Sequence, residues 1–251
     1  MIKNLIRILL ISTLFLSASC DNPSNVSGNS KKSLIVATSA DFPPFEFIQD
    51  KKIEGFDVDL VKIIAKKAGY DVHFRDITFH GLIPALKTGR VDVVIAALTA
   101  TPERSEDVDF SISYYNPNFS MLFRKGSNVP EMDDLNNKSI GVQSGSTMEL
   151  LLKDRLKSGK GNFKIVSLPR TMTMVQDLKL GRLDGVLLEE AQSKALSSKN
   201  EIFDYYVYPN HEYGYAIAFK KGSKLKYEFD EILMVMRDSG QLVDLKKKWL
   251  F

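Results

Sequence analysis

Residues 79–104 read FHGLIPALKTGRVDVVIAALTATPER, and this stretch decides the fold of the chain. The apolar residues of 82–86 predict a short helix, which tolerates Pro84 because the proline falls near the first turn. Gly89 is a natural left-handed helix end. The run 91–97 is too short for a second helix and rich in β-branched residues, so it predicts a strand covered on both faces.

The turn and strand of this stretch occur twice in the chain. Residues 86–95, LKTGRVDVVI, align with residues 178–187, LKLGRLDGVL, and match at Leu, Lys, Gly, Arg, Asp and Val. Coincidence is one explanation, because any helix-to-strand connection favours glycine at the helix end. The interpretation that we prefer is two lobes, each an open α/β sheet that contains the same helix-turn-strand unit.

Polar side chains follow both copies of the repeated strand. Thr99 and then Arg104 come after the first copy, and Glu189 comes directly after the second. Ligands of open α/β sheets bind outside the carboxyl ends of the strands. A guanidinium at one such end and a carboxylate at the other would suit a zwitterion held between two lobes.

Length and composition allow one large domain or two modest ones. The chain has 251 residues, 44% of them hydrophobic, which is ample for real cores. The formal charge is +3, and subtracting Lys3 and Arg7 of the leader leaves about +1. Charge therefore gives no argument for a nucleic-acid partner, and the interspersed charges are typical of a solvated surface.

Residues 1–20 form a leader with a cationic start, an apolar run over 8–16 and a small-residue exit that ends at Cys20. The apolar run is far shorter than the roughly 20 residues of a spanning helix, so it predicts an export signal. Cys20 is the only cysteine, and an internal disulfide is thus excluded.

The end of this leader resembles a bacterial lipoprotein signal, in which the cysteine becomes an acylated N-terminus. This resemblance implies a membrane anchor carrying palmitate-type chains on Cys20. Ser17 departs from the Leu, Val or Ile usual at its position, and a stray thiol is the alternative. In enteric lipoproteins an aspartate such as Asp21 favours retention in the inner membrane. Residues 21–32 are rich in Asn and Ser and predict a flexible tether.

The first folded residues predict a strand, a loop, a helix and a second strand. Residues 33–38 form the first strand, and the two prolines of 39–47 predict an extended loop. One or two of the phenylalanines at 42, 45 and 47 must belong to the core, and we place Phe42 in a cleft. The clearest helix covers 55–69, and the strand 70–76 completes the βαβ alternation of a parallel sheet.

Two acids begin that helix. We interpret Asp57 as its N-cap. Asp57 and Asp59 could also be metal ligands or a catalytic pair, but the helix dipole explains acids in a first turn more simply.

The second lobe has the same alternation of elements. Ser146 and Thr147 open one of its helices, where free backbone N–H groups could bind a carboxylate, although ordinary capping explains them nearly as well. In this lobe, strands are predicted over 138–142, 163–167 and 183–188, and helices over 148–156, 171–180 and 190–198. The tail 224–251 predicts two amphipathic helices that break at 239–240, with Trp249 packed on the first lobe.

Six motifs in order resemble the bacterial amino-acid-binding proteins of ABC importers, the extracellular solute-binding proteins of family 3. They are ATSADFPPFEF, GFDVDLVKIIAKKAG, LIPALKTGRVDVVIAALTATPER, DFSISYY, GVQSGST and YAIAFKKGS. The resemblance covers residues 33–251. It implies a type II periplasmic-binding-protein fold, α/β with two lobes, each a mostly parallel sheet flanked by helices. The expected first lobe is 33–114 plus 215–251, the second is 119–210, and the hinge is 115–118 and 211–214.

The resemblance also implies a ligand site between the lobes. Arg104 would bind the α-carboxylate of the ligand. The structural alternative for Arg104 is a surface ion pair with Glu103 or Glu106. Glu189, where relatives mostly have Asp, would take the α-ammonium. Phe42 and Phe79 would stack on the ligand side chain, with plain core packing as the alternative. The implied ligand contacts are Ser39, Phe42, Phe79, Ala96, Ala97, Thr99, Arg104, Gln143, Ser146, Thr147 and Glu189.

Only a few residues indicate which class of amino acid the protein would bind. Relatives that take arginine or lysine often have an acid where Ser39 stands, although Asp41 and Glu46 are near in sequence. Gln143 and Leu188 suggest a pocket that is neither strongly charged nor imidazole-lined. The sequence therefore favours a polar, uncharged L-amino acid.

The resemblance implies a monomeric, lipid-anchored protein on the extracytoplasmic side that delivers a free L-amino acid to permease subunits by hinge closure. It implies no catalysis, cofactor, metal or nucleic acid. Two other classes use the same scaffold. An enzyme resembling cyclohexadienyl dehydratase would use Glu189 as general acid, but His73, His80 and His211 lack nucleophile or metal spacing. A ligand-sensing module would need a separate receptor protein.

Overall fold

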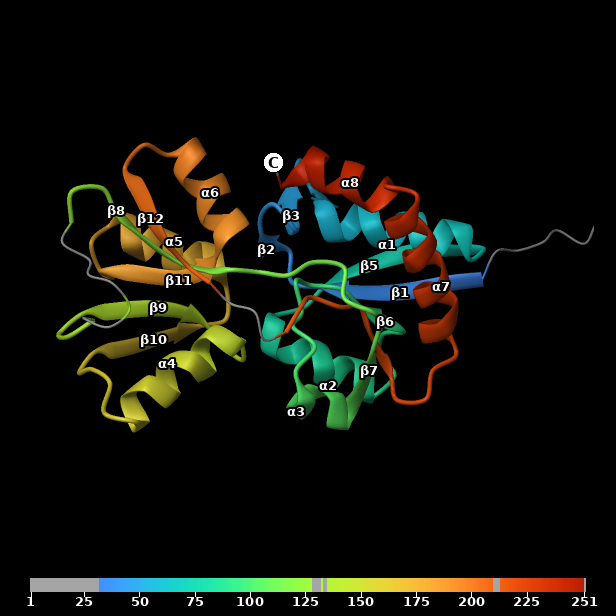
Figure 1. Ribbon diagram of the computed structural model, residues 1–251, viewed down its shortest axis with the longest axis horizontal. Helices are drawn as coiled ribbons and strands as arrows, with labels where there is room; N and C mark the ends of the chain where they lie inside the picture. The colour runs from blue at the N-terminus through green and yellow to red at the C-terminus, as the bar shows by residue number, and fades with distance from the viewer. Residues whose placement is uncertain (1–31, 128–131, 133–134, 210–212, 251) are drawn as a thin grey trace, which may run out of the picture. The chain divides into compact units, whose positions relative to one another are not determined.

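The computed structural model describes residues 32–127, 132, 135–209 and 213–250. Its two main sheets are formed by strands from different parts of the chain (Figure 1). The predicted leader over 1–20, the lipidated Cys20 and the tether up to residue 31 lie outside the described residues. Within the described residues, no helix has the length and apolar character needed to cross a membrane.

The first sheet has the strand order β5-β1-β6-β13-β7. Its centre is parallel: β1 (Lys32–Thr38) pairs with β5 (Tyr70–Asp76) on one side and with β6 (Val93–Val94) on the other. The late strand β13 (Ala218–Lys220) then pairs antiparallel with β6 and with β7 (Val108–Phe110). The C-terminal part of the chain thus returns to the first lobe, as the resemblance implied.

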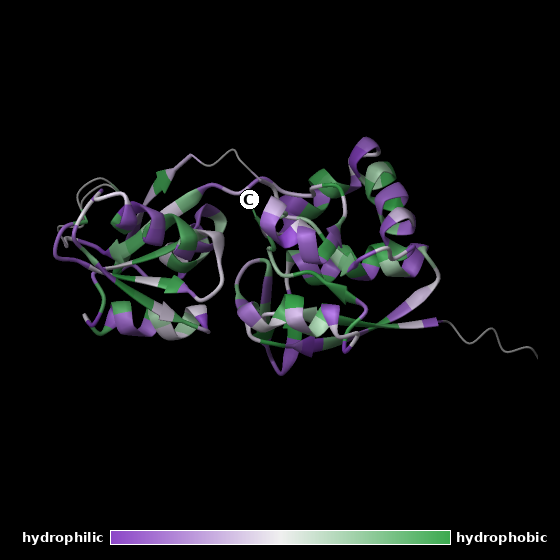
Figure 2. Cartoon of the chain, turned by 90° about the horizontal axis from the view of Figure 1, so that it is seen from below, coloured by the Kyte–Doolittle hydropathy of each residue, from purple (hydrophilic) through white to green (hydrophobic). Residues whose placement is uncertain are grey.

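Helices cover both faces of this sheet. One face carries α1 (Phe56–Lys67), α7 (Leu225–Asp238) and α8 (Gln241–Trp249), whose apolar residues share one core cluster with the strands. The other face carries the short η1 (Phe79–Gly81) and α2 (Leu82–Lys87). Figure 2 shows hydrophobic residues concentrated in the strands, as expected for a sheet that is buried on both sides.

The segment around the two prolines differs from its prediction. A small meander of β2 (Asp41–Phe42), β3 (Glu46–Gln49) and β4 (Lys52–Glu54) replaces the expected extended loop. The prolines lie in the turn between β2 and β3, so they do not interrupt the pairing. Phe45 is fully buried, which confirms that this segment contributes a ring to the core.

The second sheet has the order β10-β9-β11-β8-β12. Its parallel part pairs β9 with β10 and β11, and β8 runs antiparallel to both β11 and β12. The strands are β8 (Phe119–Arg124), β9 (Ser139–Gln143), β10 (Lys164–Leu168), β11 (Gly185–Glu189) and β12 (Phe203–Tyr208), and the helices are α4 (Thr147–Lys157), α5 (Thr171–Lys179) and α6 (Glu190–Lys199).

The repeated sequence unit makes the same contacts in both lobes. Gly89 and Gly181 have φ of 72° and 75°, the left-handed conformation that ends each helix. Asp92 Oδ2 accepts a 2.8 Å hydrogen bond from the Ile35 N–H, and Asp184 Oδ2 accepts an equal one from the Ser139 N–H. Each aspartate thereby holds the neighbouring parallel strand. The match is therefore a structural repeat and not a coincidence of sequence.

Two local predictions are wrong. Only Val93–Val94 of the run 91–97 is strand, because the chain leaves the sheet where Ala97 adopts a left-handed φ of 45°. Asp57 is not the N-cap of α1. Gly55 holds that position, and the Asp57 side chain instead bonds to the backbone N–H of Ala97 and to the Tyr114 hydroxyl.

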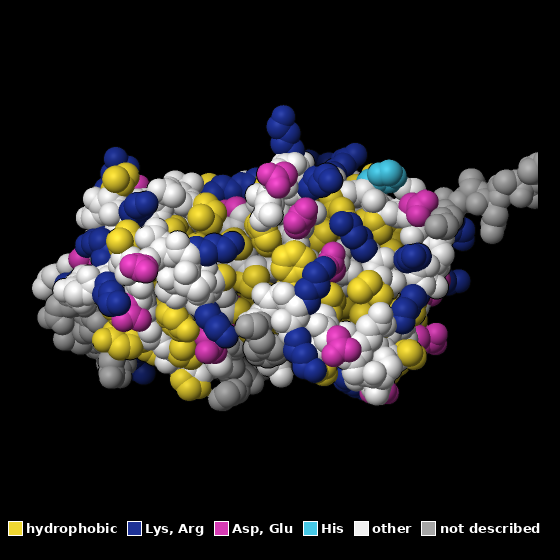
Figure 3. All heavy atoms as spheres, turned by 90° about the horizontal axis from the view of Figure 1, so that it is seen from above, with side chains coloured by type: hydrophobic (Ala, Val, Ile, Leu, Met, Phe, Trp, Pro, Cys, Tyr) yellow, Lys and Arg dark blue, Asp and Glu magenta, His cyan; other side chains and the backbone are white. Residues whose placement is uncertain are grey.

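The end of the chain and the surface agree with their predictions. The tail forms α7 and α8, and the Trp249 Nε1–H donates a 2.9 Å hydrogen bond to Asp59 in α1. Figure 3 shows basic and acidic side chains interspersed over the face that it displays. This is the mixed pattern of a solvated surface.

Candidate functional site

A small cavity lies where the two sheets present the carboxyl ends of their strands. From the first lobe it is lined by Phe42 after β1, by Phe79, and by the loop that follows β6. From the second lobe it is lined by Gln143 at the end of β9 and by the start of α4. The lining residues are Phe42, Phe79, Ala96, Ala97, Thr99, Gln143, Ser146, Thr147, Met148 and Tyr215.

Most of the predicted contact residues meet in this cavity. Phe42 and Phe79 are 5% and 9% exposed, so each ring is part of the core and also faces the cavity. Ser146 is the N-cap of α4, since its Oγ accepts a hydrogen bond from the Glu149 N–H. This is the ordinary helix capping that the sequence offered as the alternative to carboxylate binding. The buried Gln143 Nε2 has no hydrogen-bond partner among the described residues. A buried amide donor without a partner favours a ligand that brings an acceptor.

Arg104 lies against the cavity wall. Its guanidinium donates to the Thr99 carbonyl at 2.8 Å and to the Gly145 carbonyl of the second lobe at 2.9 Å, and it stands 5.5 Å from the centre of the Phe79 ring. The structure records no ion pair of Arg104 with Glu103 or Glu106 within the described residues, so the surface alternative is not observed. Desolvation lowers its pKa to about 10. The guanidinium is thus partly buried, and within the described residues it forms no ion pair.

Glu189 is the complementary group. It is fully buried at the end of β11, where it caps α6 by accepting from the Gln192 N–H at 3.2 Å and also accepts from the Tyr115 hydroxyl at 2.8 Å. Desolvation raises its pKa to about 8, against the lowering effect of these hydrogen bonds. No cation pairs with it in the described parts of the chain. A buried carboxylate of this kind is stabilised by a cation from elsewhere.

Tyr215 connects the two charged groups. It lines the cavity, pairs with Thr99 and with Tyr115 through isolated β-bridges, and its ring lies 5.7 Å from that of Tyr115, which holds Glu189. Arg104 and Glu189 both interact electrostatically with it. Neither Arg104 nor Glu189 is among the residues that line the cavity; Arg104 bonds to the lining residue Thr99, and Glu189 bonds to Tyr115, whose ring packs on the lining residue Tyr215.

Ser39 lies outside the cavity. It is fully buried, and its hydroxyl donates to Asp41 at 3.2 Å. Asp41 in turn accepts a hydrogen bond from the Thr171 N–H of the second lobe. The Ser39 side chain therefore supports a contact between the lobes.

Arg170 completes this contact. Its guanidinium makes two hydrogen bonds, 2.8 and 2.9 Å long, to the two carboxylate oxygens of Asp76 in the first lobe, and it lies 4.0 Å from Asp41. The three side chains form a polar latch between the lobes, made of Asp41, Asp76 and Arg170. Bidentate pairs of this kind fix geometry as well as charge.

Replacing Arg170 by alanine is expected to weaken ligand binding although the residue lies outside the cavity. The Arg170 and Asp76 side chains are 31% and 28% exposed, so the pair is worth about 1 kcal/mol, or about a fivefold rise in Kd. The increase should appear in the dissociation rate, measured by stopped-flow fluorescence. Arg182→Ala, which breaks the Arg182–Asp177 pair inside the second lobe, is the control and should change nothing. Equal effects of both variants would contradict the latch.

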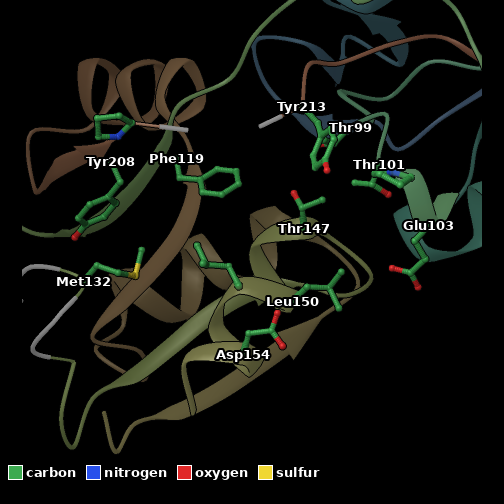
Figure 4. Close-up of a pocket in the computed structure, with 13 residues that line it drawn as sticks. Thr99, Thr101, Glu103, Phe119, Met132, Thr147, Leu150, Asp154, Tyr208 and Tyr213 are labelled. Carbon is green, nitrogen blue, oxygen red and sulfur yellow. The ribbon is translucent and has the colours of Figure 1, made fainter. Parts of the chain in front are cut away.

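A larger cavity of about 600 Å³ adjoins the small one. The two share Thr99 and Thr147, and Figure 4 shows Thr147 between Thr99 and Leu150. Its walls carry Phe119, Leu150 and other apolar side chains together with two carboxylates, Glu103 and Asp154. We interpret it as the vestibule of the small cavity. Among the described residues, no three His, Cys, Asp or Glu side chains gather in a group that could hold a metal ion.

Tyr215, Met148 and Tyr115 were not predicted as site residues. Tyr215 and Met148 line the cavity, and Tyr115 holds Glu189. Tyr115 begins the expected hinge segment 115–118 and Tyr215 directly follows the segment 211–214, so the predicted hinge was a sequence signal for both residues.

Comparison with known proteins agrees with this geometry. Residues 34–251 match the model of the bacterial extracellular solute-binding proteins, family 3. The chain belongs to this family. The match spans both sheets and the segments that connect them, so this solute-binding protein has the type II periplasmic-binding fold of its structural neighbours.

Similar proteins bind amino acids. The solute-binding protein is 38% identical over 250 residues to the arginine-binding extracellular protein ArtP of Bacillus subtilis, covering 98% of this chain and 97% of ArtP. An ancestral arginine-binding protein bound to arginine matches with a TM-score of 0.83 and 35% identity, covering 88% of this chain and 99% of that one.

An ancestral arginine-binding protein bound to glutamine matches with a TM-score of 0.81 and 36% identity, covering 87% of this chain and 98% of that one. The solute-binding protein is thus an amino-acid ABC transporter substrate-binding protein, and the family's extracytoplasmic location agrees with the predicted export signal.

Proposed function

We propose that this protein captures an L-α-amino acid between its lobes, with Arg104 on the α-carboxylate and Glu189 on the α-ammonium, and delivers it to a membrane permease. One observation carries the proposal: two opposite, desolvated charges flank Tyr215, and neither has an ionic partner among the described residues. A zwitterion would supply both missing partners. Charge-assisted hydrogen bonds contribute about 1.5–3 kcal/mol each, enough for roughly micromolar binding after costs.

The two lobes would bind the ligand in turn. We propose 33–114 plus 215–251 as the first lobe, 119–210 as the second, and 115–118 with 211–214 as the hinge between them. Because Arg104 and Glu189 come from different lobes, a ligand touches both charges only when the hinge is closed, and it stabilises that state by its differential contacts. The closed form would present the surface that the permease recognises, and release would require the open form.

The ligand side chain that we propose is cationic, of the arginine type. Two similar proteins carry arginine in their names. The cavity offers a physical reason, because Phe42 and Phe79 both line it and aromatic faces attract a planar guanidinium. Two buried acids adjoin this wall, Asp41 beside Phe42 in β2 and Asp57 on the Ala97 N–H, and their charge would add to the attraction.

A polar, uncharged side chain such as that of glutamine is the second candidate. The unpartnered Gln143 Nε2 favours it, because a ligand carboxamide would supply the missing acceptor. Among the described residues, no acidic side chain lines the small cavity. A similar ancestral arginine-binding protein has been captured with glutamine bound.

The leader completes the proposal. Cys20 would carry the lipid that anchors a monomeric protein to the membrane, and residues 21–32 would hold the lobes away from the bilayer. Replacing Cys20 by serine should release the protein from the membrane fraction without changing its ligand affinity.

Calorimetric titration of the purified protein with the twenty L-amino acids tests the binding proposal. L-Arginine should bind with a Kd of about 1 μM or less, and L-glutamine more weakly. Agmatine keeps the guanidinium but lacks the α-carboxylate, so it should not bind. Agmatine binding as tight as that of L-arginine would refute the role of Arg104, and a preference for L-glutamine would select the second candidate. The ligand should be recovered unchanged, whereas turnover of prephenate-like acids would establish an enzyme.

A further inference from the structure

Two carboxyl groups that the proposed binding mechanism does not use meet in the core of the first lobe. Glu46 on β3 is 1% exposed and Asp57 on α1 is fully buried, and their carboxyl groups lie close enough to interact with each other. Glu46 Oε2 and Asp57 Oδ1 have no hydrogen-bond partner among the described residues. Two ionised carboxylates have no donor between them, so this contact requires a proton.

The other contacts of the pair show which group holds the proton. Asp57 Oδ2 accepts from the Ala97 N–H at 2.7 Å and from the Tyr114 hydroxyl at 2.8 Å, and both bonds favour an ionised Asp57. Glu46 accepts no recorded bond from the rest of the described chain. The neutral Glu46 carboxyl is therefore the donor, and the Asp57 carboxylate is the acceptor.

The pair is built into the fold by a close backbone approach. Gly55 has a φ of 133°, and a Cβ at this position would lie 2.1 Å from the Phe45 carbonyl oxygen. The Asp57 N–H donates to that same carbonyl at 2.9 Å. Only glycine allows α1 to begin against the turn between β2 and β3, and this approach brings residues 46 and 57 together.

Asp57 connects the pair to the ligand cavity and to the hinge. Its partner Ala97 lines the cavity in a left-handed backbone conformation, which alanine adopts only when the surrounding structure supports it. Its other partner, Tyr114, directly precedes the proposed hinge segment 115–118. We propose that Glu46 and Asp57 are positioning residues: a proton held on Glu46 keeps the Asp57 carboxylate on the Ala97 N–H and the Tyr114 hydroxyl. The effect on binding rests on the proposed function, but the effect on stability does not.

The surroundings of the pair disfavour a second charge. Asp41 on β2 and the hydroxyls of Tyr114 and Tyr215 face it, and no basic side chain is recorded against it in the described residues. Burial, followed by the charge of Asp57, raises the pKa of Glu46 well above its ordinary value, and burial raises the pKa of Asp57 to about 7.

The direction of the pH dependence follows from these shifts. An unfolded glutamate ionises near pH 4.3, whereas the folded protein keeps the proton on Glu46. Unfolding above about pH 4.3 therefore releases the proton of Glu46, and this group by itself raises the unfolding equilibrium constant about tenfold per pH unit. The stability is fully present below that pH and is lost as the pH rises through the raised pKa of the pair.

Urea unfolding of the ligand-free protein between pH 5 and 7 tests the proton. Glu46→Gln keeps a donor to Asp57 but cannot titrate, so the ratio of wild-type to variant unfolding constants should rise about tenfold per pH unit. Glu54→Gln, which removes a partly exposed carboxylate from the neighbouring strand β4, should behave like wild type. Parallel pH profiles of wild type and Glu46→Gln would overturn the proposal.

A spectroscopic test needs no variant and measures the positioning directly. In carboxyl-carbon NMR spectra of the wild-type protein at pH 8, above the pKa of about 7 of Asp57, Glu46 should resonate as a neutral acid and Asp57 as a carboxylate. The Ala97 amide proton should shift with the same titration midpoint as the pair, with or without L-arginine. An ionised Glu46 at pH 8 would contradict the shared proton, and an Ala97 amide shift that does not follow the titration would contradict the positioning role.

Discussion

Arg104→Ala is expected to raise the Kd for L-arginine at least 100-fold. The variant would lose two charge-assisted hydrogen bonds to the ligand carboxylate, worth together about 3–6 kcal/mol. It would also lose the bond from the guanidinium to the Gly145 carbonyl, which joins the lobes. Isothermal titration calorimetry at matched pH measures the change.

The fold of this variant should survive, because within the described chain the Arg104 side chain donates to two carbonyl groups and the backbone N–H of residue 104 still bonds to Thr101, the cap of α3 (Pro102–Asp107). The melting temperature should therefore stay within a few degrees of wild type. Arg90→Ala is the matched control, since Arg90 is an exposed arginine of the same lobe whose guanidinium bonds to Thr88. Undiminished binding by Arg104→Ala would place the carboxylate site elsewhere.

The order of the elements was predictable because its signals are local. The helix ends at Gly89 and Gly181 follow from a left-handed backbone that glycine adopts without strain. The repeated aspartates could be recognised as equivalent because both sit two residues after an arginine in the same turn. Their partners, the N–H groups of Ile35 and Ser139, required the structure.

Asp57 shows why a local signal can mislead. An acid in the first turn of a helix is stabilised by the helix dipole wherever it occurs, so the pattern alone predicts an ordinary helix start. The partners that decide its role lie 40 and 57 residues away, at Ala97 and Tyr114. Such contacts depend on how α1 packs against the meander, which no local pattern encodes.

The cavity was predictable from topology more than from single residues. The carboxyl ends of neighbouring strands meet at one edge of a sheet, so Thr99 after β6 was expected near a ligand from its position. Gln143 and Ser39 were named by the family resemblance; Gln143 lines the cavity, but the Ser39 hydroxyl turns to Asp41. The choice between two bonding directions of a short side chain depends on tertiary packing, and the prediction of an uncharged ligand rested partly on Ser39.

Glu189→Gln is expected to raise the Kd for L-arginine by about 10- to 150-fold at pH 8. Gln keeps its one acceptor oxygen for the Gln192 N–H, and its NH2 group can donate to the Tyr115 hydroxyl oxygen, so the start of α6 should remain intact. What the substitution removes is the negative charge that would hold the ligand ammonium, worth about 1.5–3 kcal/mol. Glu190→Gln is the control, because the Glu190 carboxylate accepts a hydrogen bond from the Asn118 amide, whereas the Tyr115 hydroxyl bonds to Glu189.

The pH dependence of binding gives Glu189 a second signature. Burial raises the pKa of its carboxyl to about 8 in the ligand-free protein, and only the ionised form can hold the ammonium. Below pH 8 the ligand must therefore displace a proton, so affinity should rise about tenfold per pH unit from pH 6 and level off near pH 8. Calorimetry in two buffers of different ionisation enthalpy should count about one released proton in wild type and none in Glu189→Gln. The same pH profile in both proteins would show that the ammonium is held elsewhere.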